Sequence, residues 1–348
     1  MEKNLLVYLI LICAPLISSA QSGEGLRING YVETYYSYDF NLPDDHLRPH
    51  FMYNFKRANE FSVNIALLKA SYNSGFTRAT VALMGGNYAQ YNLAAEPQWA
   101  QMVNEASVGV RLHPKLWLDM GIMPSHIGFE SWIGAEGWHL SRSIMAENSP
   151  YFLTGARLTY AKSEKTDLIL WLTNGWQRVQ RIERNQSIGL GFAINHRPVK
   201  ELELHYANYF GNEQPQPIRL ERFFNNFYAQ YQLPKWGFTF GADYGLEEAF
   251  AGGINQWYGV TASVKRQVID KFSLAGRAEY YQDPSGILIY EGIKVTGLSC
   301  NLDYKMTEQA KARLEIRQFF AEDPVFVLPE AKFSRGNTAL TGSISFVF

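Results

Sequence analysis

Long apolar runs, cysteines and an excess of charge of either sign are all scarce in this sequence of 348 residues. Its two cysteines, Cys13 and Cys300, are too few for a disulfide framework. A formal net charge of −1 gives no reason to expect a nucleic-acid partner. Beyond the N-terminus no apolar segment is long enough to cross a membrane as a helix, and the mean hydropathy is only −0.20. The sequence therefore excludes a helical membrane protein and a disulfide-stabilised scaffold.

The N-terminus has the pattern of an export signal. Lys3 precedes an apolar core at about 5–17, and the small residues 18–20 follow it, so we predict a secretory signal peptide, residues 1–20, that is cleaved before Gln21. The residue before Cys13 is too bulky for the usual lipoprotein processing, which disfavours that alternative. The mature protein is expected to be exported.

Aromatic residues are abundant at 15% of the chain, with 21 Tyr and 22 Phe, a content that suits lipid-facing strands and interfacial girdles. In the last segment, 337–348, apolar and small polar side chains alternate with period two up to Phe348. In a soluble protein this strand would be an exposed edge without the charge, proline or cover that usually protects edges. The edge disappears if the strand pairs with the first strand and closes a barrel in a membrane.

The same alternation runs from Leu26 onward in segments of about 10 to 13 residues. Expected strands include 26–40 and 58–71, while the pattern is ambiguous at 166–176 and 293–305. Tight turns are expected near 73–75, 113–115, 162–165, 197–200, 233–235, 267–270 and 306–309. Long loops are expected near 41–57, 87–101, 127–150, 177–185, 211–222, 247–255, 283–292 and 322–336.

These turns and loops would join about sixteen strands, an even number that puts both termini on the periplasmic side. We therefore predict an all-β fold, a transmembrane antiparallel up-and-down β-barrel, with residues 21–348 as one outer-membrane domain. A soluble propeller or solenoid is the alternative, but no motif recurs from unit to unit as those folds require.

If the apolar faces meet lipid, the opposite faces line the lumen. The predicted lumen-facing set is Glu33, Glu60, Arg78, Glu105, Arg111, Asp119, Arg157, Glu201, Glu203, His205, Asp243, Lys265, Arg277, Glu279, Lys311, Arg313, Glu315 and Arg317. The last strands would form a mostly basic wall through Lys311, Arg313 and Arg317, next to Arg277. This wall is either an anion track or a salt-bridged surface that satisfies its own charges.

The connection at about 122–155 is too long to be a minimal loop, and its tryptophans and prolines suggest ordered structure. Large porins often fold one such loop into the barrel, so we predict a constriction at 127–150, with Glu130, Glu136, His139 and Arg142 meeting the wall. A loop that packs outward on its neighbours is the alternative.

This region also carries a resemblance. Gly121, Pro124, Gly128, Glu130, Trp138, Ser141, Arg142, Ser143, Pro150, Gly155 and Arg157, together with Asn174, Gly175 and Trp176, resemble motifs of the OmpL-like β-barrel porin-2 family. The resemblance extends over nearly the whole mature chain, but only these two patches are specific. It implies a Gram-negative outer-membrane barrel with channel activity, whose partners are the lipid bilayer of the outer membrane and the barrel-assembly machinery.

Two other functions are weighed against a channel. His139 and Ser141 have the His-x-Ser spacing of outer-membrane phospholipases, but they lie in a loop, and no asparagine is identifiable to orient the histidine. A plugged barrel that serves as an adhesin or structural anchor is the other alternative. The acidic and histidine cluster Asp44, Asp45, His46 and His50 lacks the helix that its spacing would need to bind a metal, so neither metal nor cofactor is expected.

The sequence thus predicts a porin through which small polar or ionic solutes diffuse passively, with no chemical step. The expected pore-lining or constriction residues are Glu130, His139, Arg142, Arg157, Arg277, Lys311, Arg313, Arg317, Glu105 and Arg111. Assembly as a homotrimer is left open.

Overall fold

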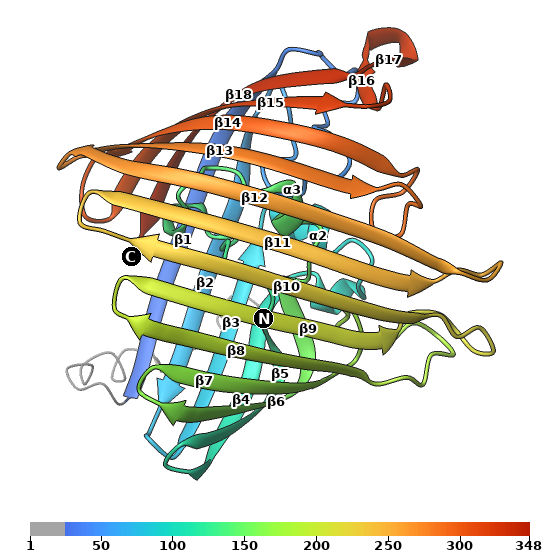
Figure 1. Ribbon diagram of the computed structural model, residues 1–348. Coiled ribbons are helices and arrows are strands. Elements are labelled where there is room, and N and C mark those ends of the chain that lie inside the picture. Colours follow the sequence, from blue (N-terminus) through green and yellow to red (C-terminus); the bar gives the residue numbers. More distant parts are fainter. Residues whose placement is uncertain (1–24) are drawn as a thin grey trace, which may run out of the picture.

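The computed structural model describes residues 25–348, which form one closed barrel of antiparallel strands (Figure 1). The sixteen barrel strands are β1 (Gly25–Asp39), β2 (Phe61–Asn73), β3 (Thr77–Gly85), β4 (Val103–His113), β5 (Leu116–Pro124), β6 (Phe152–Ser163), β7 (Thr166–Thr173), β8 (Gly189–Val199), β9 (Leu202–Asn212), β10 (Glu221–Gln232), β11 (Trp236–Glu248), β12 (Ile254–Ile269), β13 (Phe272–Asp283), β14 (Ile293–Lys305), β15 (Ala310–Ala321) and β18 (Gly336–Val347). The predicted signal peptide, 1–20, lies outside the described residues.

The barrel closes where β18 pairs with β1, as the alternation in the last segment predicted. Tyr31 lies opposite Val347 in the register. The backbone N–H of Gly30 donates to the carbonyl oxygen of Phe348 at 2.7 Å, and the N–H of Phe348 donates back at 3.0 Å. Every strand of the barrel therefore has two neighbours, so the barrel itself has no free strand edge.

The connections alternate between short turns at one end of the barrel and long loops at the other, and all of them fall where the sequence placed them. In Figure 1 the turns lie on the left and the long loops on the right. The last long loop contains a hairpin that was not predicted, made of β16 (Phe326–Leu328) and β17 (Lys332–Ser334). Both ambiguous segments are strands, although β7 ends at Thr173 rather than at 176.

The start of the second strand is a correction. It begins at Phe61 rather than at 58, because the preceding residues belong to the first long loop, where the N–H of Ala58 donates to the carbonyl oxygen of His46 at 2.8 Å. Glu60 therefore does not line the lumen from a strand. It pairs instead with Arg57 at 2.6 Å.

Side chains alternate along each strand between an apolar outer face and a covered inner face, and β11 illustrates this. Trp236, Phe238 and Phe240 are exposed on the outside, whereas Thr239 and Asp243 are buried inside. Exposed aromatic and aliphatic side chains recur in this way on every barrel strand, which suits a wall that faces hydrocarbon.

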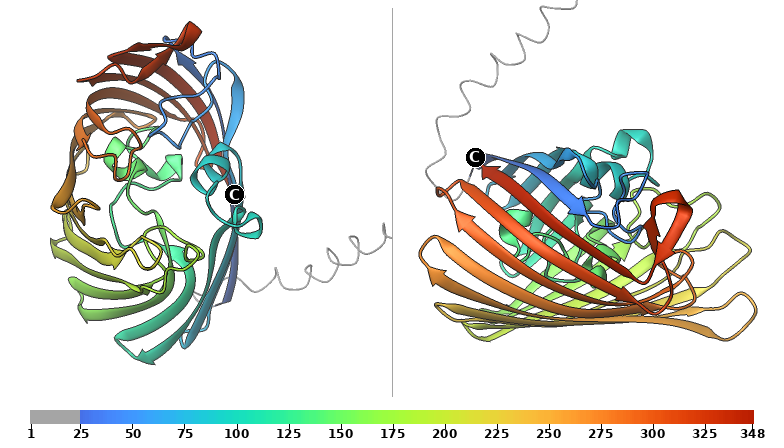
Figure 2. Two further views of the ribbon diagram at one scale, coloured as in Figure 1. Left: turned by 90° about the vertical axis from the view of Figure 1, so that its right-hand side faces the viewer. Right: turned by 90° about the horizontal axis from the view of Figure 1, so that it is seen from above.

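The helices of residues 25–348 are short and lie in the long connections. They are α2 (Asn87–Asn92), α3 (Ile144–Glu147) and the 3₁₀ turns at Gln98–Ala100, Gly134–Glu136 and Pro329–Ala331. None of the helices within 25–348 has the length and apolar character that a membrane crossing needs. The end-on view in Figure 2 shows α3 and its flanking chain inside the ring of strands, on the side of the late strands.

Candidate functional site

The segment between β5 and β6, residues 125–151, enters the barrel and is called the inward loop below (Figure 2). Its backbone binds side chains of three different strands. The N–H of Gly128 donates to Asn226 Oδ1 of β10 at 3.1 Å. The N–H of Leu140 donates to Asn301 Oδ1 of β14 at 2.9 Å, and the N–H of Ile144 donates to Glu279 Oε2 of β13 at 2.7 Å. The predicted inward fold is thus confirmed.

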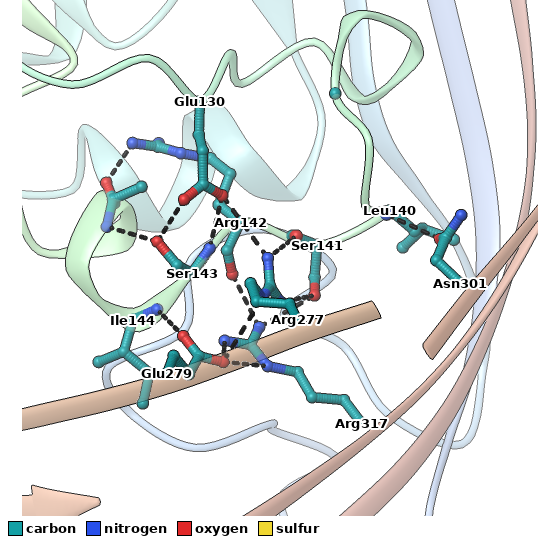
Figure 3. A network of polar contacts seen from close by, with 12 residues as sticks. Glu130, Leu140, Ser141, Arg142, Ser143, Ile144, Arg277, Glu279, Asn301 and Arg317 are labelled. Atoms are coloured by element: carbon teal, nitrogen blue, oxygen red, sulfur yellow. Dashed lines mark hydrogen bonds and ion pairs between the residues drawn. The ribbon is translucent and has the colours of Figure 1, made fainter. Parts of the chain in front are cut away.

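The middle of the inward loop is latched to β13 and β15 by two buried arginines (Figure 3). Arg277 donates to the carbonyl oxygen of Ser141 at 2.8 Å and lies 3.3 Å from Glu315 and 3.5 Å from Glu130. Arg317 pairs with Glu279 at 2.6 Å and donates to Ser141 Oγ at 2.9 Å. Their side chains are only 1% and 3% exposed. A buried ion pair needs further hydrogen bonds to offset the desolvation of its charges, and the terminal nitrogens of both guanidinium groups make them, whereas Arg277 Nε has no partner among the described residues.

A second group of contacts holds the first half of the inward loop. Arg313 pairs with Asp303 of β14 at 2.7 Å and donates to the carbonyl oxygens of Gly134 and Gly137, the latter at 3.0 Å. Lys311 donates to the carbonyl oxygen of Ala135 at 2.6 Å. The lumen face of β13–β15, called the late wall, is therefore covered by the loop. Its basic side chains bind loop carbonyls and wall carboxylates, which matches the salt-bridged alternative.

Asp303 is a residue that the sequence analysis missed. The alternation in this strand was ambiguous, so its inner face could not be assigned. The strand register identifies Asp303 as part of the lumen wall, because Asp303 of β14 lies directly opposite Arg313 of β15. This pairing can be recognised only once the two strands are aligned.

Glycines on the inner face leave room for the inward loop. A Cβ atom at Gly241 of β11 would lie 2.8 Å from Met145 Cε and 3.0 Å from Phe129 Cε1, both of which belong to the loop. At Gly237 an added Cβ would meet the ring of Trp138. Because real Cβ atoms almost never approach so closely, bulk at these two positions would displace the loop.

Arg142 and Glu147 connect the inward loop to other parts of the interior. Arg142 donates to the hydroxyl of Tyr88 in α2 at 2.8 Å and to the carbonyl oxygen of Ala146. Glu147 accepts from the N–H of Tyr53, in the first long loop, at 2.9 Å. These contacts fix the inward loop on several sides. They restrict the movement of its middle residues, about 139–147, called its central turn below.

His139 and Ser141 do not form the pair that hydrolysis would need. Ser141 Oγ accepts from Arg317 at 2.9 Å and from Arg277 at 3.3 Å. Both ring nitrogens of His139 lack a hydrogen-bond partner among the described residues. Burial, reinforced by the guanidinium groups of Arg277 and Arg313, holds the pKa of His139 well below its usual range, so the ring is neutral.

The lumen face of β2–β6, called the early wall, is different because its cations remain accessible, although its carboxylates Glu105 and Asp119 are buried. Lys69 pairs with Glu105 at 2.7 Å. Arg78 and Arg157 both pair with Asp119, at 2.5 and 3.2 Å. The side chains of Lys69, Arg78 and Arg157 are 37%, 35% and 23% exposed, whereas those of Arg277 and Arg317 are buried. Arg111, near the short-turn end of β4, is exposed.

Three interior cavities border the inward loop. The largest, about 780 Å³, opens at the short-turn end, and the other two, about 240 and 60 Å³, lie beside the loop. Glu136 lines all three cavities and is exposed. Its carboxylate accepts from Ser131 Oγ at 2.6 Å, and no ion pair joins it to any residue between 25 and 348. It is therefore the accessible acid of the inward loop.

The cluster in the first long loop has an ordinary turn structure. Asp45 Oδ1 accepts from the N–H of Leu47 at 2.9 Å, and His46 Nδ1 lies 3.2 Å from the carbonyl oxygen of Ala58. Within the described part of the chain, no three His, Cys, Asp or Glu side chains are grouped so that they could hold a metal ion.

Residues 25–348 match the protein family described as "Putative beta-barrel porin-2, OmpL-like". The chain belongs to this family. This porin is therefore an outer-membrane channel protein, in agreement with the resemblance seen in the region of the inward loop. No curated protein matches its sequence.

Solved structures of other barrels superpose on nearly the whole porin. The anion-selective porin from Comamonas acidovorans is 9% identical, with a TM-score of 0.62 and 93% of this chain and 100% of that chain covered. The outer membrane channel DcaP of Acinetobacter baumannii is 11% identical, with a TM-score of 0.62 and coverage of 94% and 99%. OmpT of Vibrio cholerae in its trimer form is 8% identical, with a TM-score of 0.60 and coverage of 94% and 100%. At these identities the superpositions establish the fold alone.

Proposed function

We propose that small polar or ionic solutes diffuse passively through this porin along the early wall, beside the inward loop. The observation that carries the proposal is the unequal exposure of charge in the lumen. Arg277 and Arg317 of the late wall are covered, whereas Lys69, Arg78 and Arg157 of the early wall reach water. Accessible charged groups along a passage favour polar over apolar solutes.

In this proposal the constriction lies between the early wall and the accessible face of the inward loop. Glu136 supplies a negative charge on the loop side, and the excess of cations on the early wall supplies a positive side. Glu130, Arg142, Arg277, Lys311, Arg313 and Arg317 act by holding the loop in place, and the ring of the buried His139 makes no polar contact within residues 25–348. Arg157 and Arg111 face the passage, while the largely buried Glu105 pairs with Lys69. The field across the gap would orient dipolar solutes.

Conductance of the purified porin in planar bilayers tests the proposal. Stepwise insertion of ohmic channels in potassium chloride supports it, and the reversal potential under a salt gradient gives the ion preference. Folded protein that inserts without current would contradict it and would favour the plugged barrel, with a role as adhesin or anchor.

Hydrolysis by His139 and Ser141 is the less favoured function, because Ser141 Oγ is bonded to two guanidinium groups and the ring of His139 has no group to orient it. Phospholipid cleavage by wild type and by Ser141→Ala separates the two functions. Turnover that disappears in the variant would favour the enzyme.

The route to the membrane and the assembly also belong to the proposal. We infer export by a cleaved signal in residues 1–20, followed by insertion through the barrel-assembly machinery. The OmpT structure of Vibrio cholerae is a trimer form, and a homotrimer is the assembly we expect here. N-terminal sequencing of the mature protein and its mass in mild detergent test these two points.

A further inference from the structure

Lysine is concentrated at the short-turn end of the barrel. Six of the seven short turns carry at least one lysine, and all of these side chains are exposed; they are Lys115, Lys162, Lys165, Lys200, Lys235, Lys271 and Lys305, called the lysine rim. The long loops have only Lys56, which is buried, and Lys332, which pairs with Glu330 at 2.7 Å. At the long-loop end of β14, Lys294 pairs with Glu322 at 2.8 Å, and the exposed cations of the long loops are mainly arginines, such as Arg184 and Arg335. The two ends of the barrel therefore differ in their content of free lysine.

Most of the lysine rim is not neutralised within the protein. Lys200 pairs with Glu201 at 3.4 Å and Lys305 with Glu308 at 2.7 Å. Lys165 donates to the carbonyl oxygen of Pro198 at 2.7 Å. The other lysines of the rim, like Lys165, have no carboxylate within ion-pair distance in the described part of the chain. These ammonium groups are free to bind an anion from outside.

The position of the lysine rim indicates which anion it meets. An exposed apolar side chain lies on or beside each of the six turns: Leu112, Tyr160, Val199, Trp236, Ile269 and Met306. On the outer face, the guanidinium of Arg266 lies 5.0 Å from the ring of Trp236. Lysines next to the end of an apolar belt extend their charged tips to the depth of lipid headgroups. Around this end of the barrel that depth is occupied by one leaflet of the bilayer.

We propose that the lysine rim binds the anionic phosphodiester headgroups of phospholipids in the leaflet that surrounds the short-turn end. The distribution of the lysines favours a lipid over an acidic protein, because they are spread over turns from β4 to β15, whereas a docked protein would need them gathered on one patch. At Lys115, Lys162, Lys165 and Lys235 the interaction is separate from the passage of solutes, since these four line none of the three interior cavities. Lys271 and Lys305 line the largest cavity and are therefore left out of the test.

Quenching of tryptophan fluorescence by brominated lipids tests the proposal. The porin, with the exposed Trp99 changed to phenylalanine, is refolded into phosphatidylcholine vesicles that contain either brominated phosphatidylglycerol or brominated phosphatidylcholine. The exposed Trp236 then reports lipids at the rim, and this background serves as wild type below. Wild type should prefer phosphatidylglycerol by about fivefold per occupied site, which corresponds to about 1 kcal/mol for each lysine near an anionic surface. The preference should fall at high ionic strength.

The variant Lys115→Gln, Lys162→Gln, Lys165→Gln, Lys235→Gln should lose the preference, whereas the same four positions changed to arginine should keep it. The matched control changes Arg184, Arg219, Lys332 and Arg335, all exposed at the long-loop end, to glutamine and should leave the preference intact. Wild type without a preference, or a glutamine variant that keeps it, would overturn the proposal. Equal loss in the control would overturn it too. If the glutamine variant does not fold, the salt dependence of wild type decides.

Discussion

Replacing Arg277 with methionine should loosen the inward loop at its central turn. The substitution keeps much of the side-chain volume and removes a guanidinium that binds the carbonyl oxygen of Ser141 at 2.8 Å. The same group lies 3.3 Å from Glu315, 3.5 Å from Glu130 and 3.6 Å from Glu279. Three carboxylates would therefore lose a buried cation in one step.

The size of the effect follows from what each carboxylate retains. Breaking a buried pair by removing one partner costs about 3–5 kcal/mol. Glu279 keeps Arg317 at 2.6 Å, and Glu315 keeps the N–H of Ser141, also at 2.6 Å. We therefore expect a loss near the lower value, about 3 kcal/mol, which raises the equilibrium constant for detachment of the turn about a hundredfold. The contacts of Arg313 and Lys311 should keep the first half of the loop in place.

The assay is single-channel recording in a planar bilayer. A detached turn should add fluctuations to the current and raise the mean conductance, because the two smaller cavities, which share Phe129, Glu130 and Arg142 as lining residues, would merge. The matched control is Arg222→Met. Arg222 is also buried and pairs with Glu247 at 2.6 Å, but this pair lies outside the inward loop. The control should lower stability without changing the current.

A current from Arg277→Met that matches wild type in mean and noise, with stability lowered as in Arg222→Met, would refute this reasoning. It would mean that Arg277 contributes to the barrel wall alone and that the loop is held elsewhere.

Three further predictions follow from the same lumen and wall. Glu136→Gln should change the free energy of unfolding by less than about 0.5 kcal/mol and lower the ratio of cation to anion permeability, which is read from the reversal potential. As a control, Glu164→Gln on a short turn should leave that ratio unchanged. Phe240→Arg should cost about 2–4 kcal/mol of unfolding free energy in vesicles, because Phe240 is on the lipid-facing side; an unperturbed unfolding midpoint would argue that this face does not meet hydrocarbon. The pKa of His139 is lowered in the folded protein, so the neutral ring contributes fully to stability above the ordinary pKa of 6.5 of the unfolded chain. Below that pH the contribution is lost, by at most about 1.4 kcal/mol per pH unit. Thermal unfolding of His139→Gln should be less sensitive to acid than that of wild type, and identical pH profiles would count against this role.

The lumen also shows how much of a charge distribution the sequence alone can predict. Period two correctly assigned Arg277, Arg313 and Arg317 to the inner face, since alternation of sides is a local property of a strand. It could not distinguish a cation that meets water from one covered by another segment. That difference depends on which part of the opposite wall the inward loop, which connects β5 and β6, covers.

The sequence alone determined the class of fold, the number of barrel strands, the position of turns and loops, and the closure of the last strand on the first. These features are set by local alternation and turn chemistry, and a one-residue change of phase would move a whole apolar face to the wrong side. Only the tertiary structure decided that the inward loop is latched to the late wall, that Asp303 opposes Arg313, and that Glu136 stays accessible. Those facts depend on contacts between residues far apart in the chain, such as Ser141 and Arg317, whose meeting no local pattern encodes.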